Sequence, residues 1–231
     1  MEPITNDDTT TQALLARIDA LEQRVQRAED TECIHKLTRA YGYYLDKALW
    51  DEILPLFTDD CEIEISGLGV YVGQKQADVL FRELLGKGPA KSDANGLLWG
   101  QLYNHMIVQG IVDVDAGGRT ASGRWRCFMQ IAEFGQKAVW GEGPYEIRYA
   151  KGDDGLWRIS RLHFYRTYHT PFDEGWAKAR SPAGGVRANL PPDRGPSVAY
   201  EPYPGNYIPL FYYANPVSGD RRHTREDVDR P

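Results

Sequence analysis

His105 and Asp46 have the side-chain chemistry of an acid–base pair. His105 lies within "QLYNHMIVQGIV", a largely apolar run with the character of a strand. A neutral imidazole with a pKa near ambient pH can take up a proton and return it. Asp46 follows Tyr41 near the end of a helical pattern and could orient or charge this imidazole. Each also has an ordinary interpretation: a satisfied strand histidine for His105, and a helix-surface carboxylate beside Lys47 for Asp46.

Hydroxyl and ammonium groups near Asp46 could complete such a site. Tyr41 lies on the apolar stripe of the same helix, so its ring is expected to be buried, and a buried tyrosine usually has a partner for its hydroxyl. Tyr41 or Tyr44 could polarise a ligand oxygen or protonate a departing hydroxyl, although packing alone explains both rings equally well. Lys47 could bind an alkoxide, or act as a base if burial lowers its pKa, but a solvent-facing lysine is the commoner case.

Two strand residues could contact a ligand directly. Arg126 shares a strand face with Arg124 and would hold an oxyanion or a carboxylate if that face lines a pocket. The opposite face, with Trp125 and Cys127, is apolar and could equally be the core, so alternation leaves the orientation open. His163, on the last strand of the pattern, could be a second pocket histidine.

Large aromatic side chains could line the same pocket, with simple core packing as the alternative: Trp50, Tyr71, Trp99 and Trp140. A metal site is not expected, because His163 and His169 lie along one strand without partnering carboxylates. An organic cofactor is not expected either, since neither GxGxxG nor GxxxxGK[ST] is present.

Composition narrows the class of protein. The 231 residues suffice for one domain with extensions. A net charge of −6 without a basic stripe argues against a nucleic-acid partner. Three isolated cysteines without CxxC spacing argue against a disulfide framework and a zinc site. The polar, acidic N-terminus and the absence of a membrane-spanning run predict a cytoplasmic protein without a membrane partner.

The first third of the chain is helical in pattern. Residues 1–10 are polar and expected to be disordered, and an apolar stripe begins after Thr11 with Leu14, Leu15, Ile18, Leu21 and Val25 and continues to Leu45. Its first part could pair as a coiled coil, but we favour a helix lying across its own domain. A second helix is predicted at 51–57, strands at 61–65 and 69–72, and a third helix at 74–85.

Four strands follow, at 101–115, 119–134, 138–150 and 156–168, joined by turns rich in Gly and Asp. Directly joined long strands predict an antiparallel, strongly twisted sheet, so the fold class is α+β. We divide the chain into residues 1–10, a domain at 11–170, and a Pro/Gly/Tyr-rich extension at 171–231. The aromatic density of this extension predicts that it packs on its own sheet, on a neighbouring subunit or at the mouth of a pocket.

Three segments resemble the SnoaL-like proteins of the nuclear transport factor 2-like superfamily. They are "IHKLTRAYGYYLDKALWDEILPLFTDDCEIEI", "LYNHMIVQGIV" and "GLWRISRLHFYRTY", and the resemblance covers roughly Glu32 to Tyr168. It implies a cone-shaped curved sheet backed by three helices, with one apolar pocket at the open end. His105 matches the pocket histidine of dehydratase-like members, and Tyr41 and Asp46 match their helix positions.

The resemblance implies several possible functions, because the superfamily includes dehydratases, isomerases, polyketide cyclases and non-catalytic binding domains. Our main hypothesis is a cofactor-free lyase acting on a hydroxylated aromatic or polycyclic molecule. It would eliminate water or, like the diarylpropane lyases, pass through a quinone methide and release formaldehyde. An isomerase or cyclase and a non-catalytic binding or assembly domain are the alternatives. A homo-oligomer, dimer or trimer, is expected in each case.

Overall fold

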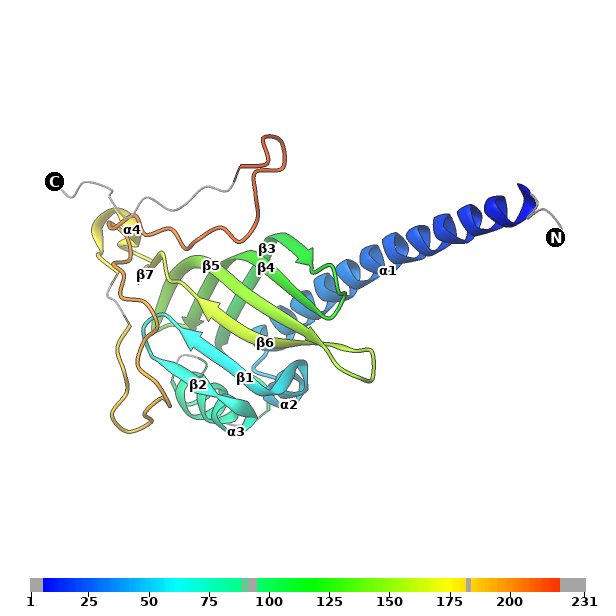
Figure 1. Ribbon diagram of the computed structural model, residues 1–231. Coiled ribbons are helices and arrows are strands. Elements are labelled where there is room, and N and C mark those ends of the chain that lie inside the picture. Colours follow the sequence, from blue (N-terminus) through cyan, green and yellow to red (C-terminus); the bar gives the residue numbers. More distant parts are fainter. Residues whose placement is uncertain (1–5, 89, 91–94, 182–183, 221–231) are drawn as a thin grey trace.

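The computed structural model describes residues 6–88, 90, 95–181 and 184–220, with side chains from Thr10 onward. Within these residues a seven-stranded sheet has the order β2-β1-β6-β5-β4-β3, and β7 pairs with β5 (Figure 1). The strands are β1 (Phe57–Ile65), β2 (Val70–Val72), β3 (Gln101–Val114), β4 (Thr120–Glu133), β5 (Lys137–Lys151), β6 (Trp157–Phe164) and β7 (Tyr168–Pro171).

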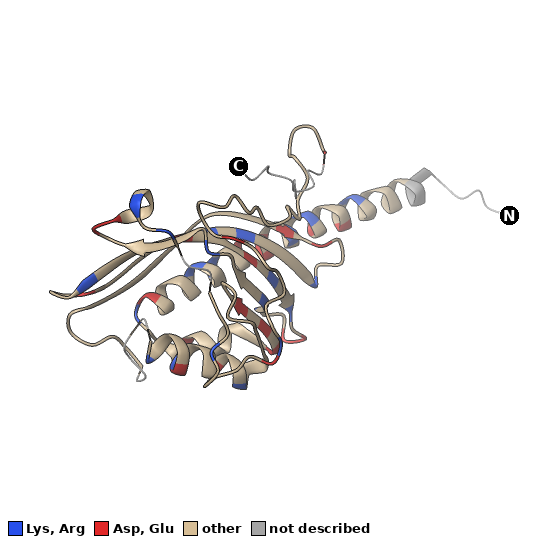
Figure 2. Ribbon diagram, turned by 90° about the vertical axis from the view of Figure 1, so that its left-hand side faces the viewer, with Lys and Arg blue, Asp and Glu red and all other residues tan. Residues whose placement is uncertain are grey.

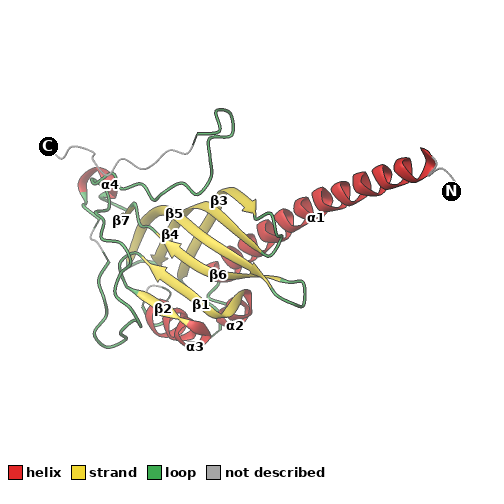
Figure 3. Cartoon of the chain, viewed as in Figure 1, coloured by secondary structure: helices red, strands yellow, loops and turns green. Residues whose placement is uncertain are grey.

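Three helices lie on one side of this curved sheet, as Figure 3 shows, which confirms the predicted α+β fold. They are α1 (Asn6–Asp46), α2 (Trp50–Ile53) with a 3₁₀ turn η1 (Leu54–Leu56), and α3 (Gly73–Asp78) with a π-helical continuation η2 (Val79–Gly86). The short helix α4 (Gly175–Lys178) lies apart from them, next to β7. No helix in the described part of the chain has the length and apolarity needed to cross a bilayer.

The sheet has two chemically different faces. The inner face, which packs against α1, α2 and α3, carries buried side chains such as Tyr103, Trp125 and Tyr145. The outer face carries the alternate residues of the same strands, including Arg124 and Glu146, which pair with each other. Because neighbouring side chains of a strand point to opposite faces, this assignment gives the direction of the other strand residues as far as the bulges, where the register shifts.

The second half of α1 is anchored to the inner face by buried polar contacts. Thr38 Oγ1 lies 2.7 Å from the Tyr149 hydroxyl. Asp30 accepts hydrogen bonds from Trp157 Nε1 at 2.8 Å and from Lys151 Nζ at 2.7 Å. Buried polar groups that find partners in this way fix the position of the helix on the sheet.

The first half of α1 projects beyond the domain instead of lying across it (Figure 1). Leu14, Leu15, Ile18, Leu21 and Val25 are 49–56% exposed. The interpretation favoured from the sequence is therefore wrong for this stretch. The helix is simply longer than the sheet beneath it, since each residue adds about 1.5 Å of length. It also begins at Asn6, inside the segment predicted to be disordered, and residues 1–5 lie outside the described residues.

Two further details differ from the expectation. The sheet is mixed, because β1 pairs with β6 in parallel, for example Ile63 with Leu162. These strands are distant in sequence, so no hairpin forces them to be antiparallel. The predicted helix at 51–57 is also shorter: Pro55 lies in the 3₁₀ turn and β1 already begins at Phe57.

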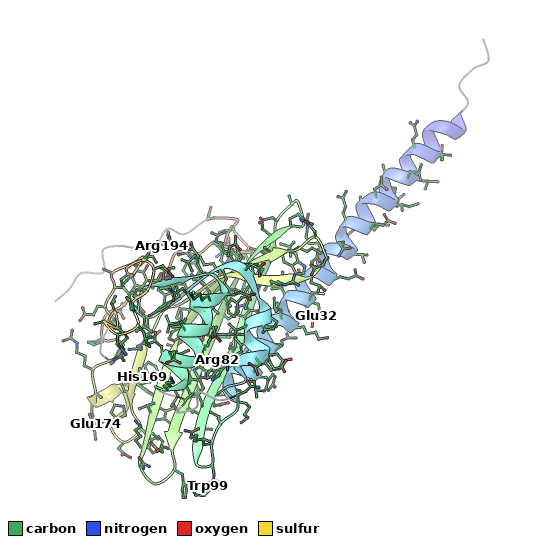
Figure 4. All side chains as sticks on the ribbon, turned by 90° about the horizontal axis from the view of Figure 1, so that it is seen from below. Glu32, Arg82, Trp99, His169, Glu174 and Arg194 are labelled. Atoms are coloured by element: carbon green, nitrogen blue, oxygen red, sulfur yellow. The ribbon has the colours of Figure 1, made fainter. Side chains whose placement is uncertain are left out.

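The C-terminal extension runs as loops along the outer face, where Figure 3 shows it in green. Ser197 donates its backbone N–H and its hydroxyl to Glu64 of β1, at 2.9 and 2.5 Å. Arg194, labelled in Figure 4, pairs with Glu62 of the same strand. Tyr203 N donates to Thr167 O at 2.7 Å. The extension therefore packs on its own sheet, and residues 221–231 lie outside the described residues.

Candidate active site on the inner face

Close packing of α1 on β3 brings Asp46 to His105. At Gly42 a Cβ atom would lie 3.2 Å from Ile107 Cδ1 and 3.6 Å from the His105 carbonyl oxygen, so the absence of a side chain lets the helix approach the strand. Asp46 is four residues further along the same helix face and is its last residue. The helix ends there because Ala48 takes a left-handed conformation, with φ of 52°.

Asp46 and His105 are in contact in the folded protein. Asp46 Oδ1 accepts a hydrogen bond from the backbone N–H of His105, and the same oxygen lies 4.0 Å from His105 Nδ1. The exposed fraction is 5% for the His105 side chain and 14% for that of Asp46. The carboxylate thus holds the strand at His105, and it is close enough to stabilise a positive charge on the imidazole.

Burial keeps His105 neutral at pH 7. Burial lowers the pKa of His105 to about 3, and the nearby His169 adds to this effect. Burial also raises the pKa of Asp46, although the hydrogen bond from His105 N–H and the charge of Lys47 oppose the shift. A neutral imidazole can accept a proton, and the carboxylate beside it favours the imidazolium that results.

Hydroxyl and thiol groups surround this pair on the inner face. The Tyr103 ring lies 4.4 Å from the His105 ring, centroid to centroid. The Tyr41 and Tyr145 rings meet edge to face at 6.2 Å, and Cys127 lies among them in the core. Burial raises the pKa of each of these groups, so they stay protonated at neutral pH and can donate a hydrogen bond to an oxygen.

His169 is a site residue that the sequence did not single out for this pocket. The pairing registers place His105, Met129, Gly141 and His169 in one row across β3, β4, β5 and β7. Gly141 leaves space within this row, because a Cβ there would lie 3.0 Å from Met129 Cε and 3.3 Å from His169 Cδ2. Only the strand order reveals this row, so His169 could not be found from spacing.

Of the helix residues predicted for the site, Tyr41 is fully buried in the core of the inner face. Tyr44 is half-buried against the core, whereas Lys47 is exposed. Trp50 is fully buried and stacks on Phe81, with 6.0 Å between ring centroids. The structure therefore does not bring Lys47 or Trp50 to His105.

The remaining predicted ligand contacts also lie away from His105. The Tyr71 ring is buried and its hydroxyl donates to Leu190 O at 2.9 Å. Trp99 is 91% exposed at the far end of the domain, as Figure 4 shows. Three residues point to the outer face, because they alternate with inner-face neighbours: Arg126, Trp140 and His163.

No group of three or more His, Cys, Asp or Glu side chains among the described residues is arranged to hold a metal ion. The inner-face site places a carboxylate from a helix beside an imidazole from a strand, and both side chains are largely closed to solvent. The ring of Tyr103 packs against the imidazole. Such a site is suited to proton transfer to and from a largely apolar molecule.

Solved structures share this architecture. The chain is similar to the crystal structure of LinA, with 18% identity, a TM-score of 0.55, and coverage of 65% of this chain and 94% of that one. It is also similar to a hexachlorocyclohexane dehydrochlorinase, LinA-type3, from Novosphingobium barchaimii LL02, with 18% identity, a TM-score of 0.55, and coverage of 64% and 94%.

A third structure is described as a putative scytalone dehydratase from Novosphingobium aromaticivorans DSM 12444. It has 18% identity to this chain and a TM-score of 0.53, and the match covers 71% of this chain and 97% of that one. At this identity the similarity establishes the fold alone. The family model of the SnoaL-like domain matches residues 26–163, which include both Asp46 and His105. The chain therefore belongs to the SnoaL-like domain family.

Proposed function

We propose that this protein is a cofactor-independent lyase acting on a hydroxylated aromatic or polycyclic molecule. The observation that carries the proposal is the contact between Asp46 and His105, which are far apart in sequence but meet in the buried core of the inner face, beside Tyr103. A purely binding or assembly role gives no reason for a neutral histidine to be held beside a carboxylate. The dehydratase and dehydrochlorinase named among the similar structures perform eliminations, which supports the same class of reaction.

In the proposed reaction His105 is the base. Asp46 Oδ1 lies 4.0 Å from Nδ1, beyond hydrogen-bond distance, so the carboxylate acts on the ring through its charge. With the proton on Nδ1, Nε2 is left to remove a proton from the substrate. The electron pair of that bond moves toward the neighbouring carbon, and the bond to a hydroxyl group breaks. The hydroxyl of Tyr41 donates a proton to the departing oxygen, so that water leaves. The imidazolium then returns its proton to the Tyr41 oxygen, which restores the starting state.

A second form of the reaction releases formaldehyde. A phenol para to the benzylic carbon loses its proton while the benzylic hydroxyl takes one from Tyr41 and leaves as water, which gives a quinone methide. His105 then deprotonates a neighbouring hydroxymethyl group, its C–C bond breaks, and formaldehyde departs as the electron pair returns to the ring oxygen. The resulting phenolate takes up the proton from the imidazolium, and the phenol's own proton returns to Tyr41. The same base and hydroxyl donor serve both forms, and the aromatic side chains of the inner face favour an aromatic substrate.

The experiment is a panel of diarylpropane diols and hydroxysteroids, incubated with the protein and analysed by product mass. Loss of water identifies dehydration, and loss of formaldehyde identifies C–C cleavage. A product with the mass of the substrate would instead identify an isomerase or cyclase. Turnover by an Asp46→Ala or His105→Ala variant equal to that of the unaltered protein would remove the proposed site.

We also propose that the protein is a homo-oligomer joined through the projecting half of α1. Leu14, Ile18, Leu21 and Val25 are separated by steps of four, three and four residues, which is the spacing of a coiled-coil seam. They are exposed in the single chain. Both acidic and basic bands flank them along the projecting helix (Figure 2), so a second copy of the same helix is a complementary partner.

A further inference from the structure

A hollow on the outer face, beneath the C-terminal tail, is separate from the inner-face site. Its volume is about 660 Å³, which falls in the range of roughly 300–1,000 Å³ typical of small-molecule pockets. The outer faces of β4, β5 and β6 form its floor, and Pro209–Tyr212 form its roof. The sheet itself lies between this hollow and His105, because floor residues and inner-face residues alternate along the same strands.

Specific contacts hold the roof in place. Arg124 Nη2 donates to the carbonyl oxygens of Pro209 and Leu210, at 2.9 and 2.8 Å. The Arg124 guanidinium also lies 4.1 Å from the centre of the Phe211 ring. The Tyr212 hydroxyl donates to Ile111 O at 2.5 Å. The hollow is thus a built feature of the fold, enclosed by a tail segment that is bonded to β3 and β4.

Two arginines face each other on the floor, and among the described residues neither has a carboxylate within hydrogen-bond distance. Arg148 and Arg161 are register partners on β5 and β6, and like charges directly opposite each other destabilise a sheet. Arg161 Nε is 3.9 Å from Glu62, which already pairs with Arg194 of the tail. For Arg148, no ion pair within 4.0 Å is formed among the described residues, and its Nη1 has only a long contact of 3.5 Å to a serine hydroxyl. An anion between the two guanidiniums would remove this repulsion.

A buried histidine beside the arginines has unused hydrogen-bonding capacity. The His163 side chain lines the hollow, is 2% exposed, and stacks on Tyr165 with 3.7 Å between ring centroids. Its Nδ1 lies 3.4 Å from Glu64 Oε2, yet neither ring nitrogen makes a hydrogen bond of good geometry within the described part of the chain. Buried polar groups are normally satisfied, so this ring points to a ligand group in the hollow.

The remaining lining limits the charge and shape of the ligand. Asp113, Asp115 and Glu146 also border the hollow, and they repel an anion with two negative charges about twice as strongly as one with a single charge. Tyr165 and the roof residues Phe211 and Tyr212 offer aromatic surface. We propose that the hollow binds an aromatic monocarboxylate, with its carboxylate between Arg148 and Arg161 and its ring against the tail. This site goes beyond the proposed lyase reaction.

The test is calorimetric titration of the full chain with benzoate, and separately with inorganic phosphate and with benzyl alcohol. Benzoate is expected to bind once per chain, and the two comparison ligands at least about tenfold more weakly, because only benzoate combines a single charge with a ring. Absence of benzoate binding, or tighter binding of phosphate or benzyl alcohol, would overturn the proposal.

Variants locate the binding. The double variant Arg148→Gln/Arg161→Gln, and Arg148→Gln alone, are expected to weaken benzoate binding by about tenfold or more. Arg148 is exposed, so the single variant keeps the fold even if the double variant does not. The matched control is Arg39→Gln, which removes one charge from an exposed residue of α1 and should bind benzoate unchanged. His105→Asn should also bind benzoate with unchanged affinity. If His105→Asn loses benzoate binding while Arg148→Gln retains it, benzoate binds at the inner-face site, which would contradict the proposal.

Discussion

Burial decides the charge of three histidines that the fold gathers on or near the sheet. It lowers the pKa of His105 and of His163 to about 3, and that of His169 to about 4. All three are neutral at pH 7, so His105 has a ring nitrogen free to accept a proton, but a pKa of about 3 makes it a weaker base than a solvated histidine. The same shifts have a consequence for stability, because the unfolded chain binds protons on these residues at a much higher pH than the folded protein does.

The free energy of unfolding is therefore expected to decrease as the pH falls from 7 to 5. In this window the unfolded state binds more protons on the histidines than the folded state, so acid favours unfolding. The raised pKa values of Asp46 and Glu146 act in the opposite direction and reduce the effect. Between these pH values the free energy of unfolding of His105→Asn should fall by about 2 kcal/mol less than that of the unaltered protein, as measured by urea unfolding. An identical loss in the two proteins would show that His105 is not held neutral by burial.

The residue types of the acid–base pair could be predicted from the sequence, but most of their surroundings could not. The resemblance singled out His105 and Asp46 because histidine in an apolar strand and aspartate at a helix end are locally visible patterns. Tyr145 and His169 come from strands whose order across the sheet is set by tertiary packing. Of the ligand contacts expected from residue type alone, Arg126 and His163 lie on the other face, because alternation does not say which face is the inner one.

At the level of elements, the approach of α1 to β3 positions the pair. Gly42→Val would place a branched side chain where even a Cβ is already 3.2 Å from Ile107. We expect it to cost about 1–3 kcal/mol of stability by overpacking and to lower turnover by moving Asp46 away from His105. Arg39→Val places the same branched side chain at an exposed position of the same helix without the clash and is the control; it lowers helix propensity slightly, whereas Gly42→Val raises it. Equal stability and turnover in the two variants would argue against this role of Gly42.

A bulge in β3 exchanges the two faces of this strand partway along its length. The register between β3 and β4 shifts between Val108 and Ile111, and Gln109 has a φ of 54°. Gly110 lies against the Trp125 ring, where a Cβ would come within 2.3 Å. Beyond the bulge the faces of β3 exchange, so Asp113 joins the outer face although His105 is on the inner one.

The projecting half of α1 should hold subunits together. Ile18→Glu/Leu21→Glu places charges in the proposed seam and is expected to convert the oligomer into monomers in sedimentation velocity experiments. Ala16→Glu/Gln23→Glu adds the same charge on the opposite side of the helix and should leave the oligomer intact. If the first variant sediments like the unaltered protein, the subunits associate through another surface, or the protein is a monomer.

At the scale of the whole molecule, the tail and the sheet act as one unit through Arg124. This side chain pairs with Glu146, donates to two tail carbonyls and lies under Phe211. Arg124→Met is expected to expose the segment around Phe211 to proteolysis and to speed its amide exchange, because these contacts are lost together. Arg126→Met is the control, since Arg126 pairs with Glu142 and Gln109 and makes no described contact with Pro209–Tyr213. Equal protection in both variants would contradict the anchoring role.

The packing of the tail could be predicted only in part from the sequence. Its aromatic density predicted that it packs on a protein surface, but that surface includes a row of polar side chains assembled from β1, β6, β5 and β4. Glu64, His163, Glu146 and Arg124 are neighbours only through the pairing registers. The α+β class and the helix-backed sheet were predictable from local periodicity, whereas the parallel β1–β6 pair and the enclosed outer hollow arise from long-range pairing.

The most direct test of the account is the turnover of His105→Asn on the substrate that the product-mass panel identifies. Removing the base is expected to lower kcat by roughly 10²–10⁴-fold, with the unfolding temperature at pH 7 close to that of the unaltered protein. His35→Asn is the matched control. His35 lies on α1 against Trp125, apart from the Asp46–His105 contact, so this variant should leave kcat unchanged. A kcat for His105→Asn within a few fold of the unaltered value would contradict the claim that this histidine carries the chemistry.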